Sequence, residues 1–211
     1  KGAIFNQPSP VMVELAELLT CKIDFADWSV FAKNGSDLTT WAIRVAREYT
    51  GRPYVIKAKG VYHGVDAWCD PGFGGRIKDD RSSILEFAWN DLDELDGLLD
   101  SHQDQVASII LTPYHHAAFA PSVLPADDFW SKIEKKCNDL GIVLILDDVR
   151  AGGRLHDYGS HRYFNFSPDL SIYSKALGNG YAISACVGKE FLRNASKEVF
   201  LTGSCWNDAV A

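Results

Sequence analysis

The sequence lacks a run of basic residues, a pair of closely spaced cysteines and a long apolar segment. Its formal net charge is −7, which argues against nucleic acid or an anionic membrane surface as a partner. The five cysteines are odd in number and include no C-x-x-C pair, so neither a disulfide framework nor a zinc site is indicated. No segment is typical of a signal peptide or a membrane-spanning helix. We therefore expect a protein of a reducing compartment, the cytoplasm.

The remaining composition is that of a globular protein, because 46% of the 211 residues are hydrophobic, which is ample for a packed core. Apolar runs and helical spacings alternate along the chain, and this order predicts an α/β fold with a mostly parallel sheet. We expect helices over residues 9–19, 35–49, 91–99 and 126–139, and strands over 28–34, 54–59, 84–89, 106–111, 141–147, 170–173 and 182–187.

Lys175 stands between two of these strands, in a connection that also contains Gly178 and Gly180. We expect the flanking buried strands to deprive its ammonium group of part of its hydration, which favours the neutral amine. A neutral lysine amine is the nucleophile that Schiff-base chemistry requires. The alternative is a surface lysine in a glycine-containing turn, which short motifs of this kind more often are.

Asp147 and Asp148 end the apolar run of residues 141–146. The run predicts a parallel strand buried on both faces, and the carboxyl ends of such strands line the ligand crevice of an open α/β sheet. Asp147 is therefore a candidate for chemistry. One alternative is a magnesium-dependent α/β enzyme in which Asp147 and Asp148 supply oxygen ligands.

Two further places suggest binding. The segment Gly35-Ser36-Asp37 opens a predicted helix, where free N–H groups and the helix dipole suit a phosphate, although a simple helix cap explains the same residues. His115 and His116 are adjacent in a loop and are candidate metal ligands, but no cysteine or third histidine lies near them in sequence. We expect no metal site.

Three motifs in this order resemble the class III aminotransferases among the fold type I pyridoxal-phosphate enzymes: Ile145–Val149, Ser174–Gly180 and Thr202-Gly203-Ser204. The likeness covers nearly the whole chain and is closest to glutamate-1-semialdehyde aminomutase-like proteins. It implies a three-layer α/β sandwich with a mostly parallel sheet, the large domain of such an enzyme. On this resemblance residues 1–211 are the cofactor-binding domain, without the small-domain segments that precede and follow it in the family.

The resemblance also implies roles for individual residues. Lys175 would form the Schiff base with pyridoxal 5′-phosphate (PLP) and move protons, and Asp147 would pair with the ring nitrogen. The cofactor-binding set comprises Gly35, Ser36 and Asp37 at the phosphate, Tyr62 and Val149 on opposite faces of the ring, and His63 beside Tyr62. Ser204 would reach the phosphate of the other subunit, so a homodimer with shared active sites is expected.

The activity implied is transfer of an amino group on a small amino acid or amine, by an aminotransferase or an aminomutase that uses small-molecule amino donors and acceptors. Racemases and decarboxylases share the same cofactor frame. Two segments depart from the family. Residues 112–117 replace a Glu-Pro-Val segment followed by Asn or Gln near the phenolic oxygen of the cofactor, and Gly153 replaces an aromatic residue. A catalytically degenerate, non-enzymatic relative is therefore a further alternative, and His115 or His116 is a candidate for the missing donor.

Overall fold

Within the described residues, seven strands form one sheet in the order β1-β7-β6-β5-β4-β2-β3. The computed structural model describes residues 7–72 and 74–208. The strands are β1 (Trp28–Ala32), β2 (Tyr54–Ala58), β3 (Ile84–Phe87), β4 (Val106–Leu111), β5 (Val143–Asp147), β6 (Leu170–Tyr173) and β7 (Ser184–Gly188). The helices are α1 (Pro10–Lys22), α2 (Gly35–Thr50), α3 (Leu92–Ser101), α4 (Phe129–Leu140), α5 (Ser160–Phe164) and α6 (Arg193–Glu198), with 3₁₀ turns η1 at Lys78–Arg81 and η2 at Glu190–Leu192.

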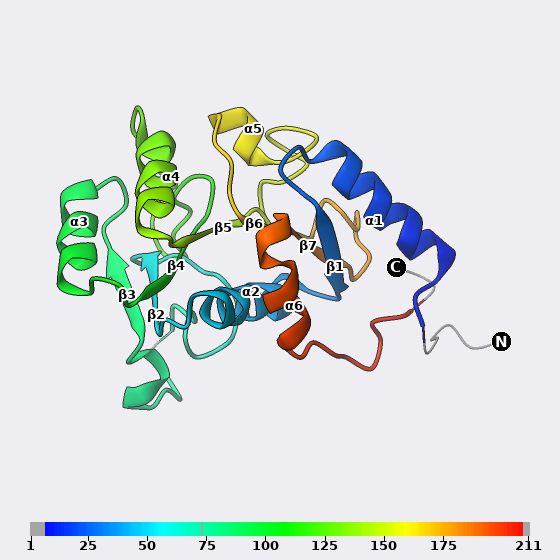
Figure 1. The fold of residues 1–211 in the computed structure, drawn as a ribbon, viewed down its shortest axis with the longest axis horizontal. Helices are drawn as coiled ribbons and strands as arrows, with labels where there is room; N and C mark the ends of the chain where they lie inside the picture. Colours follow the sequence, from blue (N-terminus) through cyan, green and yellow to red (C-terminus); the bar gives the residue numbers. More distant parts are fainter. Residues whose placement is uncertain (1–6, 73, 209–211) are drawn as a thin grey trace.

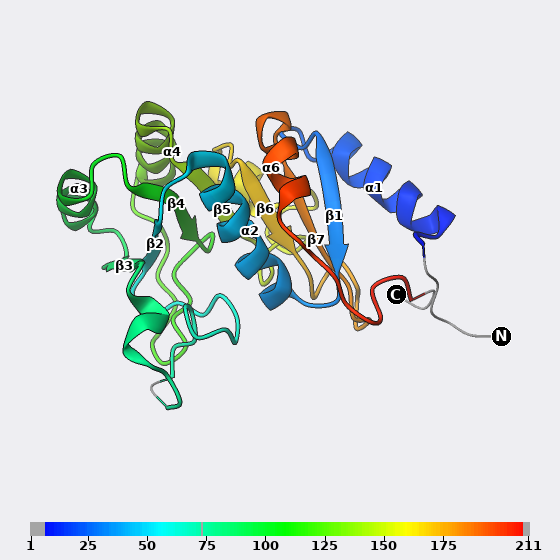
Figure 2. The ribbon, with the colours of Figure 1, turned by 60° about the horizontal axis from the view of Figure 1, so that its bottom comes forward.

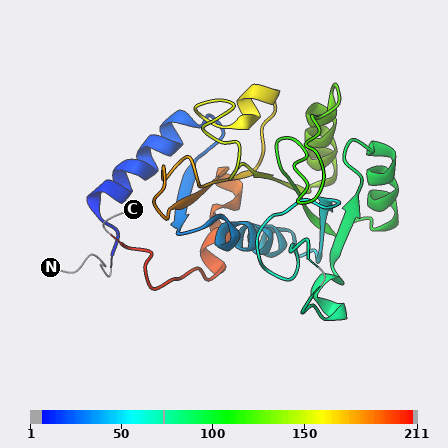
Figure 3. The same cartoon turned by 180° about the vertical axis from the view of Figure 1, so that it is seen from behind.

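The sheet is the middle of three layers, as predicted. Alternate residues of β5 point to opposite faces: Val143 and Ile145 pack with α2 and α6, whereas Leu144 and Leu146 pack with α3 and α4. Figure 1 shows α2 and α6 on one side of the sheet and α1, α4 and α5 on the other. The same separation is visible after rotation (Figure 2) and from behind (Figure 3).

The helix ends follow the local sequence. Ser9 caps α1, with Pro10 at its first position, and the side chain of Asn34 caps α2 by accepting a hydrogen bond from the N–H of Asp37. Gly51 ends α2 in the left-handed conformation, the usual role of glycine after a helix. Asp128 stands at the N-cap position of α4, but its side chain makes no capping hydrogen bond.

Strand direction brings six strand ends to one edge of the sheet. The pairs β2–β3, β2–β4, β4–β5 and β5–β6 are parallel, and β7 runs antiparallel to both β6 and β1. The strands β1 to β6 therefore point the same way. The loops that follow β1, β2, β4, β5 and β6, at residues 33–34, 59–64, 112–117, 148–150 and 174–175, emerge at this common edge, as does the turn after β3.

Some elements differ from the prediction. β7 begins at Ser184, two residues after the predicted start, and α5 and α6 are short helices that no periodicity indicated. Near the end of the described residues, 204–207 form a turn. Within the described part of the chain, no helix has the length and apolar character needed to cross a membrane.

Candidate active site

A cavity of about 320 Å³ opens at the edge where strands β1 to β6 end. The segments that follow β1, β2, β4, β5 and β6 contribute to its wall. The lining residues are Lys33, Asn34, Gly35, Ser36, Tyr62, His63, Gly64, His116, Asp147, Val149, Ser174 and Lys175. Seven of the nine predicted site residues thus lie together, although they come from four separate parts of the sequence.

The N-terminus of α2 forms one wall. Because the Asn34 cap uses the N–H of Asp37, the N–H groups of Gly35 and Ser36 have no partner among the described residues. Close packing against Val149 explains why residue 35 is a glycine: a Cβ atom on Gly35 would lie 2.7 Å from Cγ2 of Val149. The helix end thus offers N–H donors and its positive dipole to the cavity, a combination suited to an anion.

A buried histidine–aspartate pair forms the base. Nδ1 of His63 lies 2.7 Å from Oδ2 of Asp147, and Oδ1 of Asp147 accepts a hydrogen bond of 3.3 Å from the N–H of Val149. Both side chains are almost fully buried. The ring of Trp68 stacks near-parallel on His63, with 6.2 Å between ring centroids. These contacts fix the orientation of the Asp147 carboxylate, which still has lone pairs for a group in the cavity.

Lys175 lies in the turn between β6 and β7. Its side chain is exposed, so the expected loss of hydration is wrong: the flanking strands are buried, but the turn projects beyond the sheet edge. The backbone of Lys175 has a φ of +44°, which is uncommon for a residue other than glycine. Hydrogen bonds from Leu177 N to Ser174 O (2.9 Å) and from Asn179 N to Lys175 O (3.0 Å) hold this conformation.

The two adjacent histidines have different surroundings. The Nε2 of His115 lies 2.9 Å from the carbonyl oxygen of Lys59, and its ring stacks on Trp89. His116 turns the other way, lines the cavity and is 7% exposed. Burial lowers the pKa of His116 to about 4, so the ring is neutral at physiological pH. Only His116 can therefore serve the cavity.

Asp147 and Asp148 do not share a site. Asp148 is fully buried and accepts hydrogen bonds from the N–H (2.7 Å) and the hydroxyl (2.5 Å) of Ser160. Burial raises the pKa of Asp148 to about 7. The described residues contain no group of three or more metal-ligating side chains. The two carboxylates thus face different partners, and only Asp147 lines the cavity, whereas the magnesium alternative requires both of them at one ion.

Two predicted site residues lie outside the cavity lining of this chain. Asp37 accepts a hydrogen bond of 2.7 Å from Nδ2 of Asn34, as part of the α2 cap. Ser204 is exposed in the turn at 204–207. Arg150 and Arg154 are also exposed, and the guanidinium group of neither makes a hydrogen bond or ion pair with another described residue.

Lys33, Gly64 and Ser174 also line the cavity, although they were not among the site residues predicted from the sequence. A signal existed for each, since Lys33 precedes the helix cap, Gly64 follows the aromatic-histidine pair and Ser174 precedes the lysine. Gly64 is required by close packing: a Cβ atom there would lie 2.9 Å from Oγ of Ser36. This contact joins the loop after β2 to the start of α2.

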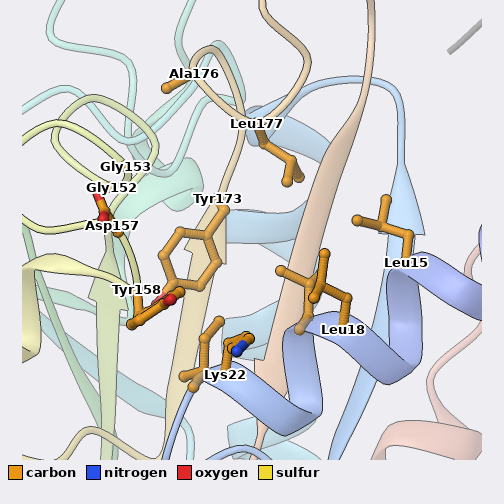
Figure 4. Close-up of a pocket in the computed structure, with 12 residues that line it drawn as sticks. Leu15, Leu18, Lys22, Gly152, Gly153, Asp157, Tyr158, Tyr173, Ala176 and Leu177 are labelled. Carbon is orange, nitrogen blue, oxygen red and sulfur yellow. The ribbon is translucent and has the colours of Figure 1, made fainter.

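A second cavity, of about 390 Å³, lies on the other side of the 174–177 turn. In Figure 4, Leu15 and Leu18 of α1 face Tyr173 and the 152–158 loop across it. Its walls are mainly apolar, and none of the nine predicted site residues lines it. We therefore assign the chemistry to the cavity that contains Lys175.

Comparison with known proteins agrees with this geometry. Residues 77–206, more than half of the chain, match the family model described as aminotransferase class-III. The aminopentol aminotransferase of Sphingopyxis macrogoltabida is 38% identical over 209 residues, which cover 99% of this chain and 50% of that protein. The 3-aminobutyryl-CoA aminotransferase of Cloacimonas acidaminovorans is 37% identical, over 97% of this chain and 49% of its own length.

The glutamate-1-semialdehyde 2,1-aminomutase of Syntrophobacter fumaroxidans is 31% identical, over 90% of this chain and 46% of its own length. These two aminotransferases are thus more similar to the chain than this aminomutase, which is the reverse of the likeness expected from the motifs. The chain spans about half the length of the curated relatives it matches. The solved FumI protein of Sphingopyxis sp. MTA144, in its PLP internal aldimine form, superposes with a TM-score of 0.95 at 38% identity, over 99% of this chain and 50% of that one.

Proposed function

Because the chain belongs to the class III aminotransferase family and has the fold of the large domain of fold type I PLP enzymes, we propose that it binds PLP and transfers amino groups. The proposed reaction is an aminotransferase or aminomutase reaction on a small amino acid or amine, with residues 1–211 as the large domain. One observation carries the proposal: a single cavity contains Lys175, the fixed carboxylate of Asp147 and the free N-terminus of α2.

The chemistry of the cavity fits the cofactor. The N–H groups of Gly35 and Ser36 suit its phosphate, and the buried carboxylate of Asp147 suits a protonated ring nitrogen. The lining also holds a buried imidazole nitrogen, Nε2 of His116, that lacks a partner among the described residues. A bound molecule with an anionic end, a cationic ring nitrogen and a further polar atom would satisfy these groups.

We assign the binding roles as follows. Gly35 and Ser36 hold the phosphate, and Asp37 supports them through the cap of α2. Tyr62, which is 41% exposed, and Val149 pack on the two faces of the ring. Stacking of an aromatic side chain on a flat ring contributes about 0.5–1.5 kcal/mol beyond the area that it buries.

The chemical roles belong to Lys175 and Asp147. When bound, PLP supplies a reactive carbonyl and an electron-accepting ring. Lys175 would hold the cofactor through its amine, and once the amino group of the substrate has displaced it, the freed Nζ would take the proton from the amine-bearing carbon of the substrate. Asp147 keeps the ring nitrogen protonated, and His63 positions Asp147 through the 2.7 Å contact. Lys175 is exposed, so its amine is accessible to a cofactor that enters from solvent.

Spectroscopy with a matched pair of lysine variants tests the proposal. The purified protein is expected to show the absorption of PLP bound as a Schiff base, and borohydride should fix the cofactor to the peptide that carries Lys175. Lys175→Ala should lose both signals and turnover, whereas Lys33→Ala, in the same cavity, should keep the fixed cofactor. A wild-type protein that binds no PLP, or a fixed cofactor in Lys175→Ala, would contradict the assignment. A panel of amines then distinguishes an active enzyme from a degenerate relative.

We also propose a homodimer in which Ser204 contributes in trans. Support comes from its position: Ser204 is an exposed hydroxyl outside the cavity lining of its own chain, so it serves such a site only across an interface with a second copy. Mixing Ser204→Ala chains with Lys175→Ala chains tests the arrangement. One competent site per mixed dimer is expected. PLP affinity that follows each chain's own Ser204, or a monomer that retains PLP, would refute it.

A cytoplasmic location is part of the same proposal. Its support is that all five cysteines are unpaired, at Cys21, Cys69, Cys137, Cys186 and Cys205. Burial raises the pKa of the Cys69 thiol to about 12, so this residue is inert at physiological pH. Fractionation of the producing cells, followed by detection of the protein, checks the location.

A further inference from the structure

A buried imidazole in the wall of the candidate cavity has a ring nitrogen without a partner. His116 lines the same cavity as Lys175 and Asp147. Its Nε2 makes no hydrogen bond with the described residues. Buried polar atoms in native proteins nearly always have a partner, from the protein, water or a ligand. The free nitrogen of His116 therefore favours a partner that enters the cavity.

The chain on both sides of His116 is tied to the loop after β2. The Nε2 of His115 lies 2.9 Å from the carbonyl oxygen of Lys59. The N–H of Ala118 donates a 3.1 Å hydrogen bond to the carbonyl oxygen of Gly60. These two attachments hold His116 between them. The imidazole is thus positioned before any ligand arrives, which lowers the entropic cost of a contact with it.

Neighbouring groups decide which part of a ligand this ring suits. Burial lowers the pKa of His116, the negative charge of Asp147 opposes the shift, and Arg150 and His63 add to it. The ring is therefore neutral, and its electrostatic neighbours include the His63–Asp147 pair. A neutral imidazole beside that pair suits an uncharged group, such as a hydroxyl, better than a phosphate. The N-terminus of α2 is available for the phosphate.

We propose that His116, and not His115, is a positioning residue that forms a hydrogen bond with a polar atom on the ring of bound PLP. The inference rests on the proposed function. It assigns to the 112–117 segment, which departs from the family pattern, a defined task in this chain. His115 has a structural task, because its contact with Lys59 holds the loop in place.

Four proteins test the inference: wild type, His116→Phe, His116→Gln and the control His115→Gln. Phenylalanine keeps a ring for the edge-to-face contact with Tyr114, whose ring centroid is 5.5 Å away, but removes the nitrogen. Glutamine keeps a donor and an acceptor. Equilibrium dialysis gives the dissociation constant for PLP, the absorption maximum of retained PLP reports its surroundings, and inorganic phosphate serves as a competing probe. Urea unfolding of the cofactor-free proteins verifies the fold, and His116→Leu replaces His116→Phe if the larger ring does not fit.

We expect His116→Phe to weaken PLP binding by about 5- to 100-fold and to shift its absorption maximum, while the affinity for inorganic phosphate is unchanged. His116→Gln should restore most of the affinity. His115→Gln, whose amide can still donate to the carbonyl oxygen of Lys59, should behave like wild type. Unchanged PLP affinity and spectrum in His116→Phe would overturn the inference while leaving the proposed function standing. An equal loss of phosphate and PLP affinity would also overturn it. A wild-type protein that binds phosphate but no PLP would overturn both.

Discussion

Replacing Asp147 with asparagine removes a negative charge from the candidate site and keeps the size of the side chain. In the structure, Oδ2 of Asp147 lies 2.7 Å from Nδ1 of His63, and Oδ1 accepts a hydrogen bond from the N–H of Val149. An asparagine oxygen can still accept one of these bonds, so the fold should be kept. The neutral amide cannot hold a proton on the ring nitrogen of PLP, so the reaction should slow down.

The expected loss follows from the burial of the site. Asp147 is 5% exposed, and breaking one partner of a buried ion pair costs about 3–5 kcal/mol. Each step of about 1.4 kcal/mol is a factor of ten in rate, so kcat should fall by about 10²- to 10⁴-fold. The assay is turnover of an amine at saturating PLP, together with the amount of PLP that the variant retains.

The adjacent carboxylate provides the control. Asp148 is equally buried, but its oxygens accept hydrogen bonds from Ser160, and burial raises its pKa to about 7. Part of the population is therefore already protonated near neutral pH, and Asp148→Asn should change kcat by less than about threefold. Near-normal kcat in Asp147→Asn, or an equal loss in Asp148→Asn, would show that the assignment of the ring-nitrogen partner is wrong.

Three further predictions concern the cavity wall. Gly35→Ala should lower the free energy of unfolding by about 1–3 kcal/mol and weaken PLP binding, because its Cβ would lie 2.7 Å from Val149. The control is Gly97→Ala in α3, whose Cβ meets no atom within 4 Å and which should not destabilise the protein. Urea unfolding compares the two variants. Tyr62→Ala should weaken PLP retention by about 0.5–1.5 kcal/mol or more without loss of stability, and Tyr62→Phe should restore it in dialysis; equal retention by both would contradict the stacking role. Folding lowers the pKa of His116 from 6.5 to about 4, so its contribution to stability is present above pH 6.5 and is lost as the pH falls through 4. Wild type should therefore lose about 3 kcal/mol more free energy of unfolding than His116→Gln between pH 7 and pH 4. Parallel curves of unfolding free energy against pH for the two proteins would refute this.

The fold was largely predictable because the sheet strands are short apolar runs with clear ends. The predicted bounds of β4 and β6 agree with the structure, since both strands are buried along their whole length and carry a continuous apolar signal. Helices α5 and α6 have only five and six residues. Such lengths give too few turns for a period to be recognised.

The members of the candidate site were predictable, but their partnerships were not. His63 and Asp147 are 84 residues apart, and no local pattern links them; their contact follows from the order of β2, β4 and β5 in the sheet. The two adjacent histidines could not be distinguished by sequence, because the orientation of each depends on the carbonyl of Lys59, a distant partner. The exposure of Lys175 was not predicted for a related reason. The apolar runs on either side of it indicate that the two strands are buried, but they carry no information about the turn between them.

The position of β1 in the sheet has a consequence for folding during synthesis. Within the described residues, β1 pairs only with β7, with Trp28 opposite Gly188, and the indole N–H of Trp28 donates to the carbonyl oxygen of Lys189. The ribosome makes β1 before its sheet neighbour β7, which emerges about 150 residues later, at ordinary translation rates several seconds or more afterwards. The helix that follows β1 carries the proposed phosphate site, so anion binding cannot form on a nascent chain that lacks β7. Cofactor capture is then a late event, and PLP added during translation should not rescue chains truncated before residue 184.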